Sequence, residues 1–225
     1  MALRLLSGGA AQALVAKMKG PRDVQGTFGA VGAMRDKLLA GEACDVLILT
    51  QALVDELTKQ GHVVAGSARP LGVVKTGVAV KSGEPAPDVS TPDALKAALK
   101  KASGVYFPDP QKATAGIHFM KVLKSLGVDG ELKDRIHNFP NGALSMGEMA
   151  GSGERGAIGC TQVTEILHVQ GVTLVGLLPK EFELATVYTA AVCATAKSPE
   201  DARAFVQLLA GDTAASARAE CGFER

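Results

Sequence analysis

Apolar and polar positions follow one another in blocks along the chain, and the blocks have a repeated order. Four times, a short apolar run is followed by a turn of small residues and then by apolar positions at helical spacing. The four turns are Ser7-Gly8-Gly9-Ala10, Gly29-Ala30-Val31-Gly32, Thr114-Ala115-Gly116 and Asn141-Gly142-Ala143. Strand, turn and helix in regular succession predict an α/β fold whose sheets are mostly parallel.

The remaining runs predict further elements. Residues 45–50 are continuously apolar after Asp45, as expected for a strand that is covered on both faces. Thr91 and Pro92 predict a helix start, because Thr is a favoured N-cap and Pro suits the first helical position. Other strands are expected at residues 2–6, 104–107, 133–139, 156–159 and 172–175, and other helices at residues 33–40, 52–60, 117–126 and 199–209.

Two runs differ from the rest because they are long, rich in β-branched residues and partly alternating: residues 72–81 and 184–192. They bracket the middle of the chain. We therefore expect two lobes. Residues 1–79 and 185–225 would form a discontinuous first lobe, and residues 80–184 would form a second lobe inserted into it. The two crossings would serve as hinges for closure on a ligand.

The small-residue turns carry the main functional signal. Each would leave a helix start with free backbone N–H groups and almost no side chain in the way. Such a start favours negative charge, because the unpaired donors and the helix dipole act together. If the fold gathers several of these starts, they form a cradle for one small anion.

Composition narrows the possible partners. The chain has 225 residues, of which 47% are hydrophobic and 21% charged, as in a globular protein with a substantial core. The net charge of +1 gives no reason to expect nucleic acid or a membrane surface as partner. Aromatic residues make up 4% and Trp is absent, which argues against base stacking and against a sugar-binding cleft. No apolar run approaches about 18 residues, so no membrane insertion is expected.

Motifs of catalysis and metal binding are missing. The sequence has no phosphate-binding loop, zinc-protease motif or nucleophile elbow. Its cysteines follow no metal-site spacing, so we expect no metal, no cofactor and four buried thiols: Cys44, Cys160, Cys193 and Cys221. Free thiols favour a reducing compartment.

The order of the motifs resembles a known family. In the first part of the chain the matching segments are Ser7-Gly8-Gly9 and residues 27–35 and 41–48, and in the second part they are Asp109-Pro110, residues 115–117, 141–143 and 158–166. Together they resemble the periplasmic molybdate-binding proteins of ABC transporters, over nearly the whole chain. The resemblance implies a type II periplasmic-binding-protein fold, a small anionic ligand held between two lobes, an ABC transporter permease as partner and a monomer.

The resemblance also implies a set of ligand contacts. In that family two serines, backbone N–H groups and a tyrosine of the second lobe hold the oxyanion. Ser7 matches the first serine, although the sequence alone favours an N-cap role for it. The second serine falls at Ala30 or Val31 and the tyrosine falls near Gln162, so hydroxyl donors worth about 1.5–3 kcal/mol each are missing. The implied contacts are Ser7, Gly8, Ala30, Val31, Ala115, Gly116, Asn141 and Gln162. The missing donors argue against molybdate and leave a small oxyanion or a carboxylate.

Two functions stay open. The first is a solute-binding protein, which the absence of a catalytic motif favours. The second is an isomerase of an unsaturated polycarboxylate on the same fold, because some relatives of the family resemble aconitate isomerase. Such an enzyme would move a proton with an acid–base group, and the candidates are His118, Cys160 and Glu165. A third possibility, a cytoplasmic ligand-sensing domain, is not favoured, because the sequence shows no DNA-binding segment.

The location depends on the first residues. Their apolar part is broken by Ser7, Gly8, Gly9 and Gln12, so they do not read as a signal peptide. We expect a periplasmic protein if a signal peptide has been removed, and a cytoplasmic one otherwise.

Overall fold

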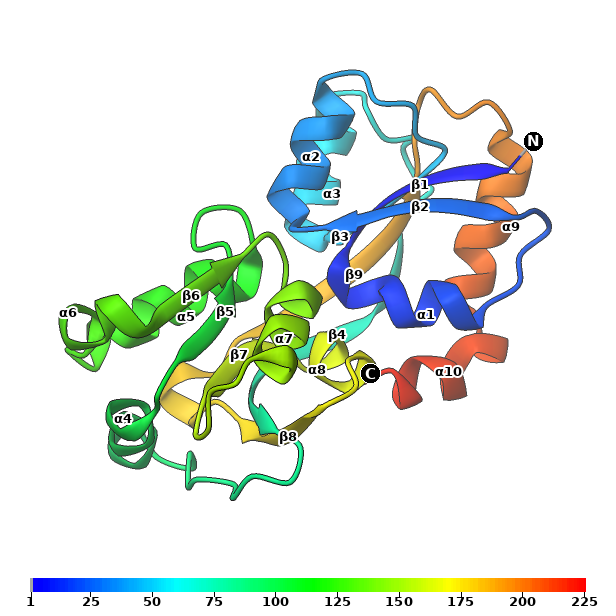
Figure 1. The fold of residues 1–225 in the computed structure, drawn as a ribbon. Helices are drawn as coiled ribbons and strands as arrows, with labels where there is room; N and C mark the ends of the chain where they lie inside the picture. The colour runs from blue at the N-terminus through cyan, green and yellow to red at the C-terminus, as the bar shows by residue number, and fades with distance from the viewer. Residues whose placement is uncertain (1) are drawn as a thin grey trace. The chain divides into compact units, whose positions relative to one another are not determined.

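The computed structural model describes residues 2–225 (Figure 1). Met1, the first residue of the expected first lobe, lies outside the described residues. Packing divides the chain into two compact units: the residues up to Val74 with Thr186–Arg225, and Lys75–Ala185. The expected crossings lay nearby, at residues 79/80 and 184/185. Strands and helices alternate in both units, which confirms the α/β class.

The first unit is built on four strands and on the first part of β4 (Arg69–Lys81), up to Val74. The four strands are β1 (Leu3–Gly8), β2 (Val24–Gly29), β3 (Val46–Thr50) and β9 (Ala185–Val192), in the order β2-β1-β3-β9. β1 is parallel to β2 and β3, whereas β9 runs antiparallel to β3; the blue strands β1 and β2 lie side by side in Figure 1. The helices are α1 (Gln12–Lys17), α2 (Val31–Leu39), α3 (Gln51–Lys59), α9 (Pro199–Ala210) and α10 (Ala215–Glu220), with short 3-10 turns at Gly9–Ala11 and Asp212–Ala214.

The core of this unit explains why nearly all residues of β3 are apolar. Leu47, Ile48 and Leu49 are all fully buried, so both faces of the strand are covered. Leu14 of α1 and Phe205 of α9 belong to the same core. The strand expected at residues 45–50 is therefore confirmed, with Asp45 just before it.

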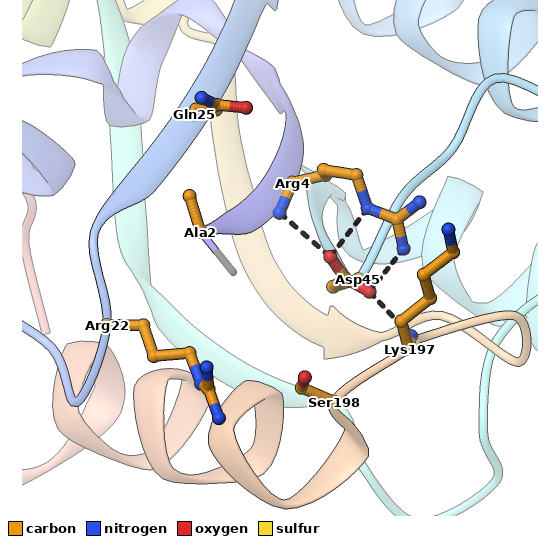
Figure 2. Close-up of a pocket in the computed structure, with 7 residues that line it drawn as sticks. All are labelled: Ala2, Arg4, Arg22, Gln25, Asp45, Lys197 and Ser198. Carbon is orange, nitrogen blue, oxygen red and sulfur yellow. Dashed lines mark hydrogen bonds and ion pairs between the residues drawn. The ribbon is translucent and has the colours of Figure 1, made fainter.

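Asp45 carries a buried charge that joins three segments of the chain (Figure 2). Its carboxylate accepts hydrogen bonds from Arg4 N (2.9 Å), Nε (2.8 Å) and Nη2 (2.6 Å), and from Lys197 N (2.7 Å). The Arg4 guanidinium, helped by the backbone donors, lowers the pKa of Asp45 to about 2, although burial acts in the opposite direction. The start of β1, the start of β3 and the turn before α9 are thus held at one carboxylate.

The second unit is a five-stranded sheet. Its strands are β4 (Arg69–Lys81, in this unit from Lys75), β5 (Val105–Pro108), β6 (Ile136–Phe139), β7 (Ile158–Gln162) and β8 (Val172–Leu177). The order is β4-β7-β5-β6, with β8 also on β4. β5 is parallel to β6 and β7, and β4 is antiparallel to β7 and β8. The helices are α4 (Pro92–Lys101), α5 (Thr114–Ser125), α6 (Asp129–Leu132), α7 (Gly142–Gly151) and α8 (Val163–His168), with 3-10 turns at Lys133–Arg135 and Lys180–Phe182.

The two faces of this sheet have separate cores. Val78 of β4 and Cys160 of β7 pack with Phe119 of α5. The neighbouring Ala79 of β4 packs instead with Met146 and Met149 of α7. This alternation is the period-two pattern of a strand that is buried on both sides.

Local sequence signals predicted the start of α4 correctly but placed the starts of two strands too early. The start of α4 is confirmed, because the Thr91 side chain accepts from Ala94 N at 3.1 Å and Pro92 is the first helical residue. The strand expected over residues 133–139 is wrong in its first half, where Arg135 turns to donate to the carbonyls of Lys100 and Ala102 at the end of α4. The strand expected from residue 156 begins at Ile158, because Gly156 has a φ of 78°.

We expect Asp45→Asn to lower the free energy of unfolding by about 2 kcal/mol at pH 7, the value that corresponds to its lowered pKa. A lowered pKa stabilises the folded state above the ordinary value of 3.8 and stops doing so as the pH falls through about 2. The difference between wild type and variant should therefore shrink between about pH 4 and pH 2 in urea unfolding. Glu42→Gln, which breaks an exposed ion pair with Lys37, is the control and should change little. A pH-independent difference would contradict the assignment.

Candidate functional site

In the first unit, three strands end at the same level. Gly8 of β1 pairs with Gly29 of β2, and Ser7 pairs with Ile48 of β3. The helices α2 and α3 begin directly after these strands. Within residues 2–225, no side chain caps either start, whose N-cap residues are Ala30 and Thr50. The backbone N–H groups of both first turns are thus presented at one edge of the sheet.

Ser7 and Gly8 lie at the centre of this edge. Ser7 is fully buried, and its hydroxyl donates to the Gly8 carbonyl at 2.9 Å. A Cβ on Gly8 would lie 2.8 Å from Val31 Cγ1 and 3.1 Å from Tyr188 Cε1. Val31 and Tyr188 therefore pack against Gly8, and a larger residue would not fit. Among the expected contacts of this unit, the structure brings Ser7, Gly8, Ala30 and Val31 together.

Further polar residues lie at this edge, on β9 and at the start of α3, and were not predicted from the sequence. Thr189 of β9 donates to Gln51 Oε1 at 2.6 Å, and Gln51 Nε2 donates to Asp55 at 2.7 Å. Tyr188 lies opposite Thr50 in the β3–β9 register. The sequence did contain a signal for these polar residues. Thr50-Gln51 stands between a strand and a helix, as the four small-residue turns do, although this turn lacks a glycine.

In the second unit, α5 begins close against the end of β5. A Cβ on Gly116 would lie 2.2 Å from the Pro108 carbonyl and 2.3 Å from the Asp109 carbonyl. Within the described part of the chain, no side chain caps this helix at Ala113. Ala115 and Gly116 thus lie in the uncapped first turn of a 12-residue helix, as a donor site for an anion requires.

The start of α7 is different, because side chains of the protein itself accept hydrogen bonds from its backbone N–H groups. The Asn141 side chain accepts from Leu144 N at 2.9 Å. The buried Glu165 carboxylate accepts from the N–H groups of Gly142 and Ala143, and from Thr161 Oγ1 at 2.6 Å. Burial raises the pKa of Glu165, and these hydrogen bonds oppose the rise. The anion position predicted at this turn is occupied by a carboxylate of the protein itself.

Thr76 and Gln162 form a buried polar pair on β4 and β7. They are opposite each other in the antiparallel register. Thr76 N donates to Leu184 and Thr76 O accepts from Leu178, both at 3.2 Å. Both bonds are made on the side of β4 that faces away from β7, so Thr76 and Gln162 exchange no backbone hydrogen bonds with each other. In such a non-hydrogen-bonded pair the two side chains approach most closely.

The polar atoms of this pair lack partners. Thr76 and Gln162 are each only 2% exposed. Thr76 Oγ1, Gln162 Nε2 and Gln162 Oε1 make no hydrogen bond to any residue in the range 2–225. Each such buried atom costs about 1–3 kcal/mol unless something from outside the chain satisfies it. Thr76 gave no signal in the sequence, because threonine is ordinary in a β-branched strand.

The pair lies on the same side of the sheet as α5. Side chains two apart on a strand share a face, so Thr76 and Gln162 follow Val78 and Cys160, which pack with Phe119 of α5. β5 and β7 are parallel, and α5 starts at the carboxyl end of β5. The uncapped start of α5 and the Thr76–Gln162 pair are therefore at the same end of the sheet.

The three candidate acid–base residues have different surroundings. His118 Nε2 lies 2.8 Å from the Phe182 carbonyl and joins α5 to the 3-10 turn at Lys180–Phe182. Cys160 is fully buried, and burial raises the pKa of its thiol well above the ordinary value, which disfavours the thiolate. Glu165 follows Gln162 in the first turn of α8 and holds the start of α7.

A pocket of about 540 Å³ lies at the other end of the strands of the first unit. Figure 2 shows its lining residues: Ala2, Arg4, Arg22, Gln25, Asp45, Lys197 and Ser198. Arg4 is paired with Asp45 there, and Arg22 is paired with Asp201 of α9. Because Asp45 already accepts four hydrogen bonds, we assign this cluster to the structure of the unit.

Residues 2–225 contain no helix that is both long and apolar enough to cross a bilayer. They also contain no group of three His, Cys, Asp or Glu side chains arranged to hold a metal ion.

Comparison with known sequences identifies the family. The family described as bacterial extracellular solute-binding protein matches residues 9–224. The chain belongs to this family. An aconitate isomerase from Pseudomonas sp. is 31% identical over 193 residues, which are 85% of this chain and 71% of that protein.

Solved structures confirm the fold of this solute-binding protein. The periplasmic molybdate-binding protein of Azotobacter vinelandii superposes with a TM-score of 0.83 at 16% identity, covering 99% of both chains. The sulfate-binding protein SubI of Mycobacterium tuberculosis gives 0.73 at 16% identity, covering 99% of this chain and 86% of that one. The resemblance to molybdate-binding proteins is thus confirmed for family and fold.

We expect Gly142→Ala to lower the free energy of unfolding by roughly 1–3 kcal/mol, because the added Cβ would overpack a filled site. That Cβ would lie 2.0 Å from Thr161 Oγ1 and 2.1 Å from Glu165 Oε2. Gly147→Ala in the same helix is the matched control, since its Cβ would meet no described atom within 4 Å. This control should be neutral or stabilising by up to about 1 kcal/mol. Equal effects of the two variants in chemical unfolding would show that Glu165 does not fill this helix start.

Proposed function

We propose that this protein binds a small organic acid and delivers it to a membrane transporter. The observation that carries the proposal is the Thr76–Gln162 pair, whose three polar atoms are buried without a partner among residues 2–225, at the same end of the sheet as the uncapped start of α5. A ligand oxygen at this place would satisfy the donors, and the helix start would favour its negative charge. At the strand ends of the first unit, the uncapped starts of α2 and α3 offer backbone donors of the same kind.

The chemistry of Gln162 favours a carboxylic acid over a bare oxyanion. Its amide offers both a donor and an acceptor. A fully ionised molybdate or sulfate has only acceptor oxygens, so the acceptor of the amide would stay unpaired. A hydroxyl or a protonated carboxyl of an organic acid could donate to it, while a carboxylate oxygen accepts from the amide or from Thr76. Two donor positions of the molybdate-binding proteins are also without hydroxyls here, at Ala30–Val31 and at Gln162.

The family supports the transport part of the proposal. Extracellular solute-binding proteins capture a ligand for an ABC transporter, and the family match covers residues 9–224. We therefore propose a periplasmic location and an ABC transporter permease as partner. Detection of the protein in a periplasmic extract of its own host, with a cytoplasmic marker absent, would test the location.

A ligand screen tests the proposal directly. Thermal unfolding would be measured with molybdate, tungstate, sulfate, phosphate and a set of di- and tricarboxylates that includes aconitate. A ligand at about 100 times its Kd should add roughly 2.7 kcal/mol, which raises Tm by several degrees. We expect carboxylates to stabilise the protein. Stabilisation by molybdate or tungstate alone would overturn the organic-acid assignment, and no stabilisation at all would overturn ligand capture.

We expect Thr76→Val to weaken binding of the best carboxylate by about tenfold, the value of one hydrogen bond to a charged group. The unliganded variant should be as stable as wild type or more so, because a buried unpaired hydroxyl is removed. Ser145→Ala, which removes another buried and unpartnered hydroxyl from α7, is the control and should leave affinity unchanged in calorimetry. An unchanged Kd for Thr76→Val would remove this residue from the site.

An isomerase is the second candidate, and the 31% identity to an aconitate isomerase over 85% of the chain favours it. The reaction would remove a proton from a carbon next to the double bond, shift the double bond, and return a proton to the other end of the system. Glu165 is the first candidate for the proton carrier, because burial raises the pKa of its carboxyl above the ordinary value, although hydrogen bonds from Thr161 and from backbone N–H groups oppose the rise. His118 and Cys160 are the alternatives.

Proton NMR in D₂O tests this activity. If the protein is an isomerase, trans-aconitate should convert to the cis isomer and take up deuterium. Glu165→Gln should then slow turnover at least about 100-fold, as expected for loss of an acid–base group, while calorimetry still detects ligand. Tight binding of aconitate without any conversion would exclude the isomerase and leave the binding function.

A further inference from the structure

Two cysteines of the first unit face each other. The Sγ atoms of Cys44 and Cys193 are 3.1 Å apart, and both residues are buried. Their backbones are held in place, because Cys193 N donates to Asp45 O at 3.0 Å just after β9 ends. A disulfide has an S–S bond of about 2.05 Å, so the sulfurs need to approach by about 1 Å. We propose that Cys44 and Cys193 form a disulfide when the chain folds under oxidising conditions.

The other two cysteines do not share this arrangement. Cys160 packs in the core of the second unit, beside α5. Cys221 lies at the end of α10, and it is buried in the first unit. The hydrogen bond from the Cys193 thiol to Cys44, together with burial, raises the pKa of Cys193, so the Cys193 thiol is unreactive once it is enclosed.

A disulfide between Cys44 and Cys193 would cross-link two parts of the chain that are far apart in sequence. Cys44 and Cys193 are separated by 149 residues, and the whole second unit lies between them. The first unit is made from two chain segments that meet through the β3–β9 pairing and through Asp45 and Lys197. A disulfide would join these segments covalently. A cross-link over so long a loop restricts the unfolded chain strongly.

Formation of this disulfide requires an oxidant. Two thiols lose two protons and two electrons as the S–S bond forms, and a small-molecule disulfide or the disulfide of an oxidoreductase is reduced to two thiols. Since both sulfurs are buried in the folded protein, the exchange takes place during folding. The family is described as extracellular, and in oxidising compartments such bonds persist.

Refolding in defined redox buffers tests the proposal. The full chain would be unfolded in guanidinium and refolded either with oxidised and reduced glutathione or with dithiothreitol. Free thiols would then be alkylated under denaturing conditions and counted by mass spectrometry. We expect two alkylated cysteines after oxidative refolding, Cys160 and Cys221, and a peptide pair that links Cys44 to Cys193. Four alkylated cysteines, or a different pairing, would overturn the proposal.

The stability of the two forms gives a second readout. The oxidised protein should melt roughly 5–10 °C above the reduced one, as expected for a native cross-link in a chain of this size. In Cys193→Ser this difference should vanish. In Cys221→Ser, the control, the difference between the two forms should persist even if both melt lower. A redox-dependent Tm that survives in Cys193→Ser would contradict the assignment.

Discussion

The first unit depends on one buried carboxylate. A charge that is taken out of water must be paired and hydrogen-bonded, and Asp45 meets this requirement with four donors from Arg4 and Lys197. Those donors come from different parts of the chain, so they fix where β1, β3 and the turn before α9 begin. Because strands of similar length that start together also end together, this constraint places the ends of β1 and β3 at one edge. Ser7 and the start of α3 are therefore neighbours.

The second unit uses the starts of α5 and α7 in different ways. Both α5 and α7 begin at the carboxyl ends of parallel strands, where backbone donors favour an anion. At α7 the donors are taken by Glu165 and Asn141, which makes this turn a rigid part of the structure. At α5 the donors are left without a side-chain cap in the described chain, and the unpartnered Thr76 and Gln162 lie at the same end of the sheet. The same local motif thus serves structure at one place and, we propose, ligand capture at the other.

Most of the fold could be predicted because its signals are local. The covered strand at residues 45–50, the Thr91 cap and the alternation of strands and helices all follow from short-range periodicity and capping. The prediction failed over residues 133–135, where Arg135 satisfies carbonyls of α4 that are distant in sequence. The ligand contacts taken from the family resemblance remain predictions, and Thr76 could not have been added to them from its own sequence context.

The sequence by itself determined which segments become strands, where helices start, and that several starts would offer backbone donors. These properties depend on a residue and its near neighbours. Only the tertiary structure decided which starts are free, because that depends on side chains brought in from elsewhere. Glu165 reaches the α7 start from another helix, and Thr76 meets Gln162 through strand register. Cys44 and Cys193 meet for the same reason, across an inserted unit that no local pattern spans.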